Sequence, residues 1–254
     1  MSPNTTRLAG RTALVTGSTG GLGAAFATAL AEQGAFVIVT GRDAARGRGI
    51  VDRVESSGGS AAFVAADLGA GAAQVRRLAD EATASAGGRI DILVNNAAML
   101  ITPTPTAEVP EKLVRDALAV NVTAPFLLTG VIAPAMAERG AGSIINIGSI
   151  NGLIGMAGSA LYSTTKAAIH SLTKSWADEY GPRGVRVNTV APGPSMTERN
   201  AQFADHLAPL LARVPSRRAS TLSEVAAAVV FLASDDAANI TGATLSVDGG
   251  WSAV

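Results

Sequence analysis

The chain of 254 residues contains no cysteine, and no part of it carries a long run of like charges. Without cysteine it can form neither a disulfide nor a thiolate metal site, a composition typical of the reducing cytoplasm. Basic and acidic residues number 20 each, so the formal net charge is zero and no surface for nucleic acid or anionic lipid is indicated. Residues 1–11 lack the apolar core of a signal peptide, and no apolar stretch is long and uninterrupted enough to span a membrane. We therefore expect a cytoplasmic protein with no nucleic-acid or membrane partner.

Histidine and aromatic residues are also scarce. The two histidines, His170 and His206, have no partner at metal-ligand spacing, so no metal site is predicted. We expect His170 to be a structural residue of a helix, whereas His206 falls in a stretch that could touch a substrate. Trp176 and Trp251 are expected to fill packing or subunit contacts rather than a site.

Apolar, β-rich runs alternate along the chain with alanine-rich amphipathic segments. Such runs are typical of buried parallel strands, and the segments between them are typical of helices that cover both faces of a sheet. The predicted strands are 12–17, 35–41, 61–67, 91–97, 143–149, 185–193 and 243–250. The predicted helices are 22–33, 43–57, 72–86, 110–139, 159–180 and 223–234. We predict a single α/β domain over residues 1–254, with a doubly wound, Rossmann-type parallel sheet of about seven strands.

Turn-forming and polar residues gather where the predicted strands end. Gly17, Asp67, Asn95, Ser149 and Pro192 each lie at or just past the C-terminal end of a strand. In a doubly wound sheet the ligand crevice lies outside the carboxyl ends of the strands. We therefore expect these residues to share one site.

The first predicted strand runs into the stretch TGSTGGLG, residues 16–23, at the mouth of the first helix. Gly17, Gly21 and Gly23 permit a tight turn and a close backbone approach, and the helix N-terminus offers free N–H groups to a pyrophosphate. Glycine-rich turns can also serve packing alone, but this position in an α/β pattern is the context that a dinucleotide site requires.

The end of the second strand bears on the choice of dinucleotide. Gly41 stands where an acidic residue for the ribose 2′-hydroxyl is expected, and Arg42 follows it. A guanidinium suits a 2′-phosphate because it offers several donors and a permanent charge. The alternative is a solvated Arg42 beside Asp43 as a helix cap. The pattern favours NADP(H), with NAD(H) as the alternative.

Tyr162 and Lys166 are four residues apart in a predicted helix, so both side chains project from one face. A free tyrosine titrates near pH ~10, and a nearby ammonium group lowers that pKa because it favours the phenolate. Ser149, at a strand end, can hydrogen-bond a substrate oxygen. Taken alone, the Tyr–Lys spacing is more often that of a surface or packing pair than of a catalytic one.

Together these features resemble the short-chain dehydrogenase/reductase family, over nearly the whole chain. The matching elements are Thr16 to Gly23, Asp67-Leu68, NNAA at Asn95 to Ala98, Asn121, Ser149, Tyr162, Lys166, Pro192-Gly193, Thr197 and VDGG at 247–250. The resemblance implies an NAD(P)-dependent oxidoreductase that transfers hydride to or from the carbonyl or secondary alcohol of a small substrate.

The resemblance also implies a role for each matched position. Tyr162 would be the general acid or base, and Lys166 would lower its pKa and bind the nicotinamide ribose. Ser149 would polarise the carbonyl, and Asn121 would hold a water of a proton relay. Cofactor contacts are implied for Gly17, Ser18, Thr19, Gly21, Leu22, Gly23, Arg42, Asp67, Leu68, Asn95, Ala97, Tyr162, Lys166, Pro192, Gly193, Ser195 and Thr197.

Three positions depart from the family pattern. Ala98 replaces a usual glycine, and Gly148 stands where a second serine is frequent. Gly20 stands where many NADP-preferring members carry arginine or lysine, which leaves Arg42 to carry that preference almost alone.

The substrate lid is expected around residues 194–215. The segments around the predicted pocket contain few charges, so an apolar or moderately polar small-molecule substrate is favoured. Their apolar side chains are Leu100, Ile101, Leu153, Ile154, Met156, Met196 and Phe203.

Two other functions fit parts of the pattern. A 3-oxoacyl carrier-protein reductase shares every motif and needs a basic surface for its carrier, to which Arg139 and Arg183 could contribute. A non-catalytic dinucleotide-binding sensor is disfavoured because a binder needs no proton relay. By resemblance, the helices 110–139 and 159–180 are expected to form a homotetramer or a homodimer.

Overall fold

The apolar runs form one seven-stranded parallel sheet in the order β3-β2-β1-β4-β5-β6-β7. A computed structural model describes residues 6–197 and 209–254. The strands are β1 Thr12–Val15, β2 Phe36–Gly41, β3 Ser60–Ala65, β4 Ile92–Asn95, β5 Gly142–Ile147, β6 Val185–Pro192 and β7 Thr244–Val247. The predicted fold class is therefore confirmed.

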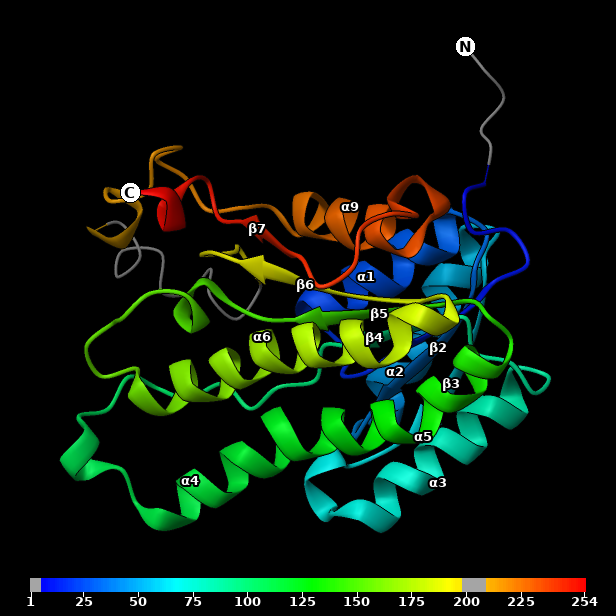
Figure 1. Cartoon of the computed structure of the whole chain (residues 1–254), viewed down its shortest axis with the longest axis horizontal. Helices are drawn as coiled ribbons and strands as arrows, with labels where there is room; N and C mark the ends of the chain where they lie inside the picture. Colours follow the sequence, from blue (N-terminus) through cyan, green and yellow to red (C-terminus); the bar gives the residue numbers. More distant parts are fainter. Residues whose placement is uncertain (1–5, 198–208) are drawn as a thin grey trace.

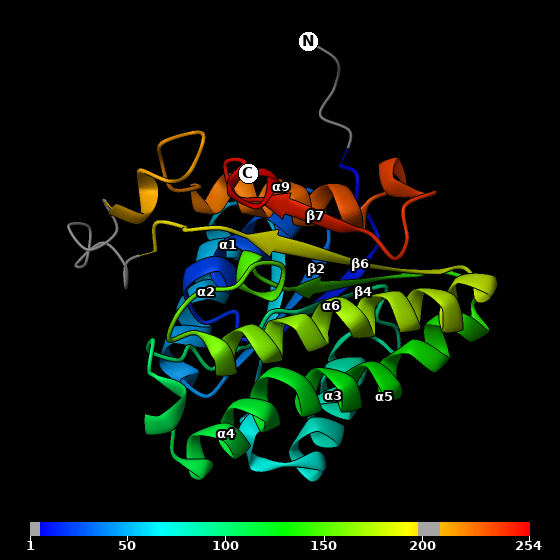
Figure 2. The same cartoon turned by 60° about the vertical axis from the view of Figure 1, so that its left-hand side comes forward.

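Helices cover both faces of the sheet, as Figures 1 and 2 show. One layer contains α1 and α9, which pack against each other, with α2 beside α1; the other contains α3, α4, α5 and α6. The helices are α1 Gly21–Glu32, α2 Ala44–Ser56, α3 Ala72–Ser85, α4 Glu111–Leu118, α5 Ala124–Glu138, α6 Ala160–Tyr180 and α9 Leu222–Ala233. This arrangement is why the strands read as continuous apolar runs rather than as alternating ones.

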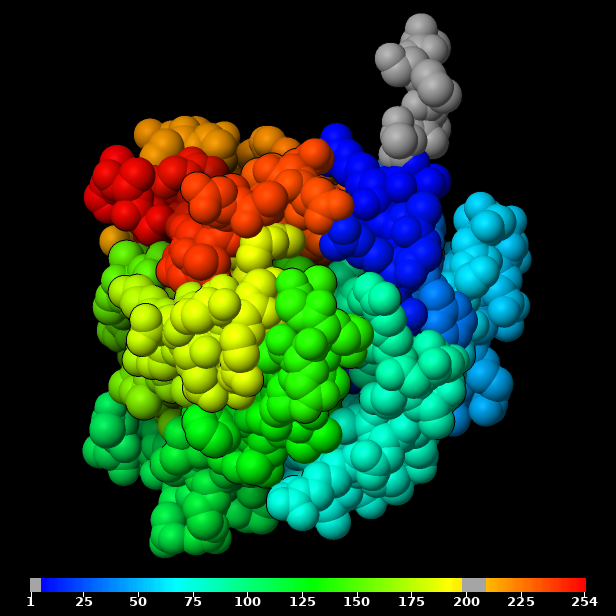
Figure 3. Space-filling view, turned by 45° about the vertical axis from the view of Figure 1, so that its right-hand side comes forward, coloured from blue at the N-terminus to red at the C-terminus, as the bar shows by residue number. Residues whose placement is uncertain are grey.

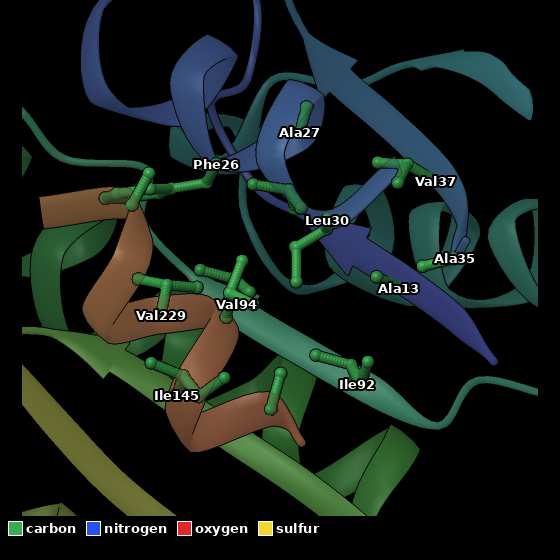
Figure 4. Packing of buried hydrophobic residues seen from close by; sticks show 14 of the residues in the cluster. Ala13, Phe26, Ala27, Leu30, Ala35, Val37, Ile92, Val94, Ile145 and Val229 are labelled. Carbon is green, nitrogen blue, oxygen red and sulfur yellow. The ribbon is translucent and has the colours of Figure 1, made fainter. Parts of the chain in front are cut away.

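The sheet separates two apolar cores. Figure 4 shows the first, in which Phe26 and Leu30 of α1 and Val229 of α9 pack onto the strands. The second core joins α3, α5 and α6 to the opposite face. Every residue of β1 and β4 is buried, so the two strands that flank the topological switch point are fixed on both sides.

That switch point positions the site. The chain moves from β1 outward to β2 and β3, then returns to the other side of β1 at β4. Ligand crevices of doubly wound sheets lie at such a point, outside the carboxyl ends of the strands. Six of the strands end one to three residues earlier than predicted, because residues such as Thr16, Asp67 and Ser149 leave the sheet to form the site.

The predicted helix 110–139 is interrupted. Between α4 and α5 lies a π-helical segment, η3, from Ala119 to Thr123, which contains Asn121. The whole stretch Glu111–Glu138 is long and apolar enough to cross a membrane, contrary to the sequence expectation. Here it packs on α3 and α6, and its buried residues belong to the second core, as in a core helix.

The edge of the sheet opposite the site is formed by the N-terminal ends of the strands. In Figure 3 the yellow surface of the segment after α6 lies beside the green surface of α5. Arg139, at the end of α5, donates to the carbonyl of Ile90 just before β4, and Arg183 lies in η5, Gly181–Arg183, just before β6. Both arginines therefore lie at this opposite edge.

Candidate active site

The glycine loop joins β1 to α1 and is held unusually close to its neighbours. Gly17 has a φ of +64°, and a Cβ there would lie 2.8 Å from Cα of Ala97. A Cβ at Gly23 would collide with the carbonyl oxygen of Gly17. The Nδ2 group of Asn96 donates to the carbonyls of Thr16 and Gly17 at 2.7 and 3.1 Å. The loop thus presents bare backbone at the N-terminus of α1, as a bound pyrophosphate requires.

A cleft of about 1400 Å³ runs from this loop along the carboxyl edge of the sheet. Most of the predicted cofactor residues line it together: Gly17, Thr19, Gly21, Leu22, Gly23, Arg42, Asp67, Leu68, Ala97, Tyr162, Lys166, Pro192, Gly193, Ser195 and Thr197. Its length and its glycine-lined end fit a dinucleotide. Three predicted residues, Ser18, Asn95 and Asn121, do not line it.

Ser18 and Asn95 face the interior. The fully buried hydroxyl of Ser18 donates to the carbonyl of Val15 and accepts from the N–H of Thr40, so it ties the loop to β2. Asn95 Nδ2 donates to Thr129 Oγ1 and to Asn146 Oδ1 at 3.1 and 2.9 Å. Both side chains therefore support the cleft from behind, and Asn96 rather than Asn95 shapes its wall.

Two arginines lie at the end of the cleft beyond the glycine loop. Arg42 follows β2, and Arg46 lies in the first turn of α2. A Cβ at Gly20 would collide with the Arg46 guanidinium, and a Cβ at Gly41 would lie 2.6 Å from Cγ2 of Thr19. A side chain at position 41 would therefore require the Thr19 side chain to move. Arg46 was missed from the sequence, although Asp43, which caps α2 by accepting from the Arg46 N–H, was a signal for the first turn of a helix.

The predicted catalytic residues converge from β5 and α6. Ser149 follows β5, and its Oγ accepts from the N–H of Asn151 at 3.2 Å; its interaction with the Tyr162 hydroxyl acts to lower the pKa of that tyrosine. Lys166 lies one turn beyond Tyr162, with Nζ 5.7 Å from the tyrosine ring centroid and donating to the carbonyl of Ile147 at 2.8 Å. Ser149, Tyr162 and Lys166 all line the cleft.

Burial governs the ionisation of this group. It raises the pKa of Tyr162 to about 12, against a smaller lowering by the Ser149 hydrogen bond. It also lowers the pKa of Lys166 to about 8. The net shift is opposite to the one expected from Lys166, because desolvation of the phenol is the largest cause and raises the Tyr162 pKa. The Tyr162 hydroxyl is therefore protonated at neutral pH.

Asn121 is buried in the π-helical segment η3. Its Oδ1 accepts from the Met99 N–H at 2.6 Å, and its Nδ2 donates to the Met99 carbonyl and to Thr165 Oγ1. π-Helical insertions are frequent at functional sites because they reorient backbone groups. Here the side chain joins the loop after β4 to α6 next to Lys166.

The other end of the cleft is apolar. Leu100 and Met156 line it as predicted, whereas Ile101, Leu153, Ile154 and Met196 do not. Asn151, Leu210 and Trp251 also line it and were missed. Trp251 was expected to pack rather than to form a site; it does pack, on Ile150 and Val214, but it also lines the cleft. Phe203 and His206 lie outside the described residues, as does lid segment 198–208.

Comparison with known proteins agrees with this geometry. A family profile described as enoyl-(acyl carrier protein) reductase matches residues 17–252. The cis-4-hydroxycyclohexanecarboxylate dehydrogenase of Sinomonas cyclohexanicum is 40% identical, over 96% of this chain and 97% of that protein. The 3-oxoacyl-(acyl-carrier-protein) reductase of Vibrio cholerae is 39% identical, over 96% and 98%.

Solved structures extend the likeness to three dimensions. A gluconate 5-dehydrogenase from Burkholderia cenocepacia, in complex with NADP and tartrate, superposes with a TM-score of 0.91 at 34% identity, covering 99% of this chain and 98% of that one. Fold, cleft and relatives together define an oxidoreductase that uses a nicotinamide dinucleotide. The chain belongs to the short-chain dehydrogenase/reductase family.

Proposed function

We propose that this enzyme transfers hydride between NADP(H) and the carbonyl or secondary-alcohol carbon of a small, apolar or moderately polar substrate, with Tyr162 as the acid or base. The observation that carries the proposal is the convergence of Ser149, Tyr162 and Lys166 on the cleft that begins at the glycine loop. A binding module has no need of this convergence.

Each residue has a distinct part in carbonyl reduction. When bound, the reduced nicotinamide supplies the hydride that adds to the carbonyl carbon. Ser149 donates a hydrogen bond to the carbonyl oxygen and stabilises the charge that develops there. Tyr162 gives its proton to the same oxygen, and its raised pKa keeps that proton in place until the oxygen becomes basic.

Lys166 and Asn121 support the proton transfer. Lys166, fixed by the carbonyl of Ile147, places its ammonium group beside the phenol and stabilises the phenolate that forms. Asn121, which hydrogen-bonds Thr165 beside Lys166, would help to hold a water that links Lys166 to solvent, so that Tyr162 can be reprotonated. In alcohol oxidation the same proton moves in the opposite direction.

The preference for NADP(H) is supported by charge and by space at the 2′ end of the cleft. Arg42 and Arg46 provide two guanidinium groups there, and position 41 is a glycine packed on Thr19 rather than the acidic residue that would bind a 2′-hydroxyl. The related gluconate 5-dehydrogenase is described in complex with NADP.

The substrate class is supported by the apolar end of the cleft. Leu100, Met156, Leu210 and Trp251 surround it, and Asn151 adds a polar amide next to Ser149. Such a chamber suits a compact aliphatic or alicyclic alcohol better than a strongly anionic compound. One relative is described as a dehydrogenase of a hydroxycyclohexanecarboxylate.

The 3-oxoacyl carrier-protein reductase alternative keeps the support of named relatives. Its suggested docking arginines do not favour it, because Arg139 and Arg183 lie at the edge of the sheet opposite the cleft. A carrier that delivers an acyl chain must dock near the cleft mouth.

The direct test is turnover on a panel of alicyclic and aliphatic alcohols and ketones, with NADP(H) and NAD(H) in parallel. Acetoacetyl thioesters of a carrier protein and of a small thiol are included as a third arm. We expect turnover of the small substrates with NADP(H). Turnover of the carrier thioester alone would favour the alternative reductase, and cofactor binding without any turnover would favour the sensor.

Assembly into a homotetramer or a homodimer is proposed on the basis of exposed apolar side chains on two helices. Leu118, Phe126 and Val131, on α4 and α5, expose 38–51% of their area to solvent. Exposed apolar patches of this kind mark interaction surfaces. Light scattering of the purified protein tests the proposal, and a monomer would contradict it.

A further inference from the structure

Tyr162, Lys166 and His170 follow one another at four-residue spacing along α6, so their side chains form one stripe of the helix. The first two belong to the catalytic group. The third is buried, with 7% of its surface exposed, and it does not line the cleft. Its position directly behind Ser149 suggests a use beyond packing.

The His170 ring connects two segments that are distant in the sequence. Its Nε2 lies 3.1 Å from the carbonyl oxygen of Ser149, and its Nδ1 lies 3.2 Å from Oγ1 of Thr244 on the edge strand β7. The ring therefore fastens the loop that carries the catalytic serine to the frame of the sheet.

The chemistry of the two partners fixes the tautomer. Burial lowers the pKa of His170, and the charges of Lys166 and Lys174 lower it further, against an opposing effect of the Ser149 carbonyl. The ring is therefore neutral at neutral pH. Because a carbonyl oxygen only accepts, Nε2 carries the proton, and Nδ1 accepts from the Thr244 hydroxyl.

Two glycines make room for this ring. A Cβ at Gly148 would lie 2.7 Å from Cε1 of His170, and a Cβ at Gly152 would lie 2.6 Å from its Cδ2. Real Cβ atoms do not approach other atoms so closely. A serine is frequent in the family at position 148. Here the glycine at that position leaves the space that the His170 imidazole occupies.

The strand exit is held by two successive side chains of the stripe. Lys166 Nζ donates to the carbonyl of Ile147, and His170 Nε2 donates to that of Ser149. Between them, the N–H of Gly148 donates to the carbonyl of Val190 on β6 at 2.8 Å. Ser149 is attached to this backbone, so the orientation of the backbone determines where the Ser149 hydroxyl points.

We propose that His170 is a positioning residue for Ser149. Its Nε2–H group holds the Ser149 carbonyl, and thereby aims the Ser149 hydroxyl at Tyr162 and at the substrate oxygen. The inference rests on the proposed function, in which Ser149 polarises the carbonyl.

The matched variants are His170→Gln and His170→Asn. The amide nitrogen of glutamine reaches the place of the imidazole Nε2, whereas that of asparagine reaches only the place of Nδ1. We expect His170→Asn to lower kcat about tenfold with little change in the Kd for the cofactor, because a catalytic group slightly out of place slows the reaction strongly. His170→Gln should recover most of that loss.

The pH profile separates positioning from mere packing. In His170→Asn, the weakened hydrogen bond between Ser149 and Tyr162 should move the basic limb of the kcat profile to higher pH. A packing role would lower the melting temperature of both variants and leave the profile of the folded enzyme unchanged. That result would overturn the proposal.

A second readout does not need turnover. Amide hydrogen exchange of residues 149–153 should be faster in His170→Asn and close to wild type in His170→Gln. Thr244→Val should also speed this exchange, and Thr244→Ser, which keeps the hydroxyl, should not. If His170→Asn does not fold, the difference in exchange between Thr244→Val and Thr244→Ser tests the proposal instead.

Equal exchange in all variants and wild type overturns the positioning role. Absence of wild-type turnover on the substrate panel, with the expected exchange pattern, instead counts against the proposed function and leaves the attachment of the Ser149 loop supported.

Discussion

The guanidinium of Arg46 lies against Gly20, in the space that a side chain on the glycine loop would need. Family members that prefer NADP often carry a cation on the loop at this position, and this chain has none there. Its cation comes instead from the first turn of α2, where Asp43 caps the helix by accepting from the Arg46 N–H at 3.0 Å. The Arg46 guanidinium therefore lies near the place that a cationic side chain at position 20 would take.

Replacing Arg42 or Arg46 by alanine should weaken the binding of NADP⁺ selectively. Each guanidinium contributes charge-assisted hydrogen bonds to a 2′-phosphate, so each loss should raise its Kd about tenfold or more. The Kd for NAD⁺ should stay nearly constant. Fluorescence titration with both cofactors measures this, and Arg48→Ala removes the same charge from the exposed side of α2 as a control.

An equal weakening of NADP⁺ and NAD⁺ binding would show that the arginines act on the loop rather than on the phosphate. Unchanged binding of both cofactors would remove the basis of the NADP(H) preference.

Asn95 and Asn96 provide a test of neighbouring side chains with opposite orientations. Asn95→Ala removes the buried donor to Asn146 Oδ1 and Thr129 Oγ1, so we expect a loss of about 1–3 kcal/mol of unfolding free energy with little change in cofactor affinity. Asn96→Ala frees the carbonyls of Thr16 and Gly17, so it should raise the cofactor Kd by roughly fivefold.

Urea denaturation and cofactor titration of the two variants check this contrast. A large loss of affinity in Asn95→Ala would return that residue to the cofactor site, where the family resemblance placed it.

The sequence was sufficient for the fold because apolar runs and amphipathic segments are local patterns. Each predicted strand is present, and each predicted helix is present except 110–139, which the π-helical segment η3 interrupts. The strands differ from the prediction at their ends, as at Ser149, where the backbone leaves the sheet. The motif residues could be found because their types and spacing are themselves the signal.

The remaining site residues depend on tertiary contacts that no local pattern contains. Trp251 enters the cleft because Gly249 and Gly250, both with positive φ, turn the chain back after β7. Arg46 and His170 are identified only when the space around Gly20 and Gly148 is known. The direction of the Tyr162 pKa shift likewise could not be predicted from the sequence, since it depends on burial.

Tyr162→Phe should abolish turnover while cofactor binding is retained. It removes only the hydroxyl that transfers the proton, so kcat should fall by about 100- to 10,000-fold. The chain contains one other tyrosine, Tyr180, at the far end of the same helix, and Tyr180→Phe is the matched control. Initial rates and cofactor titration measure the two effects, and substantial turnover in Tyr162→Phe would remove the assigned role.

The buried Lys166 should make the stability of the protein depend on pH in an unusual direction. In the unfolded chain this lysine has its ordinary pKa of 10.5, whereas in the folded protein burial lowers its pKa to about 8. Between these pH values the unfolded state binds more protons, so the free energy of unfolding rises with pH.

Lys166→Met lacks this contribution. We expect the stability of the wild type relative to this variant to increase by roughly 3 kcal/mol from pH 8 to pH 10.5. Urea denaturation at several pH values measures the difference, and Lys174→Met, which removes an exposed lysine of the same helix, should show no such increase. A difference that stays constant or shrinks over this range would mean that Lys166 keeps its proton inside the folded protein.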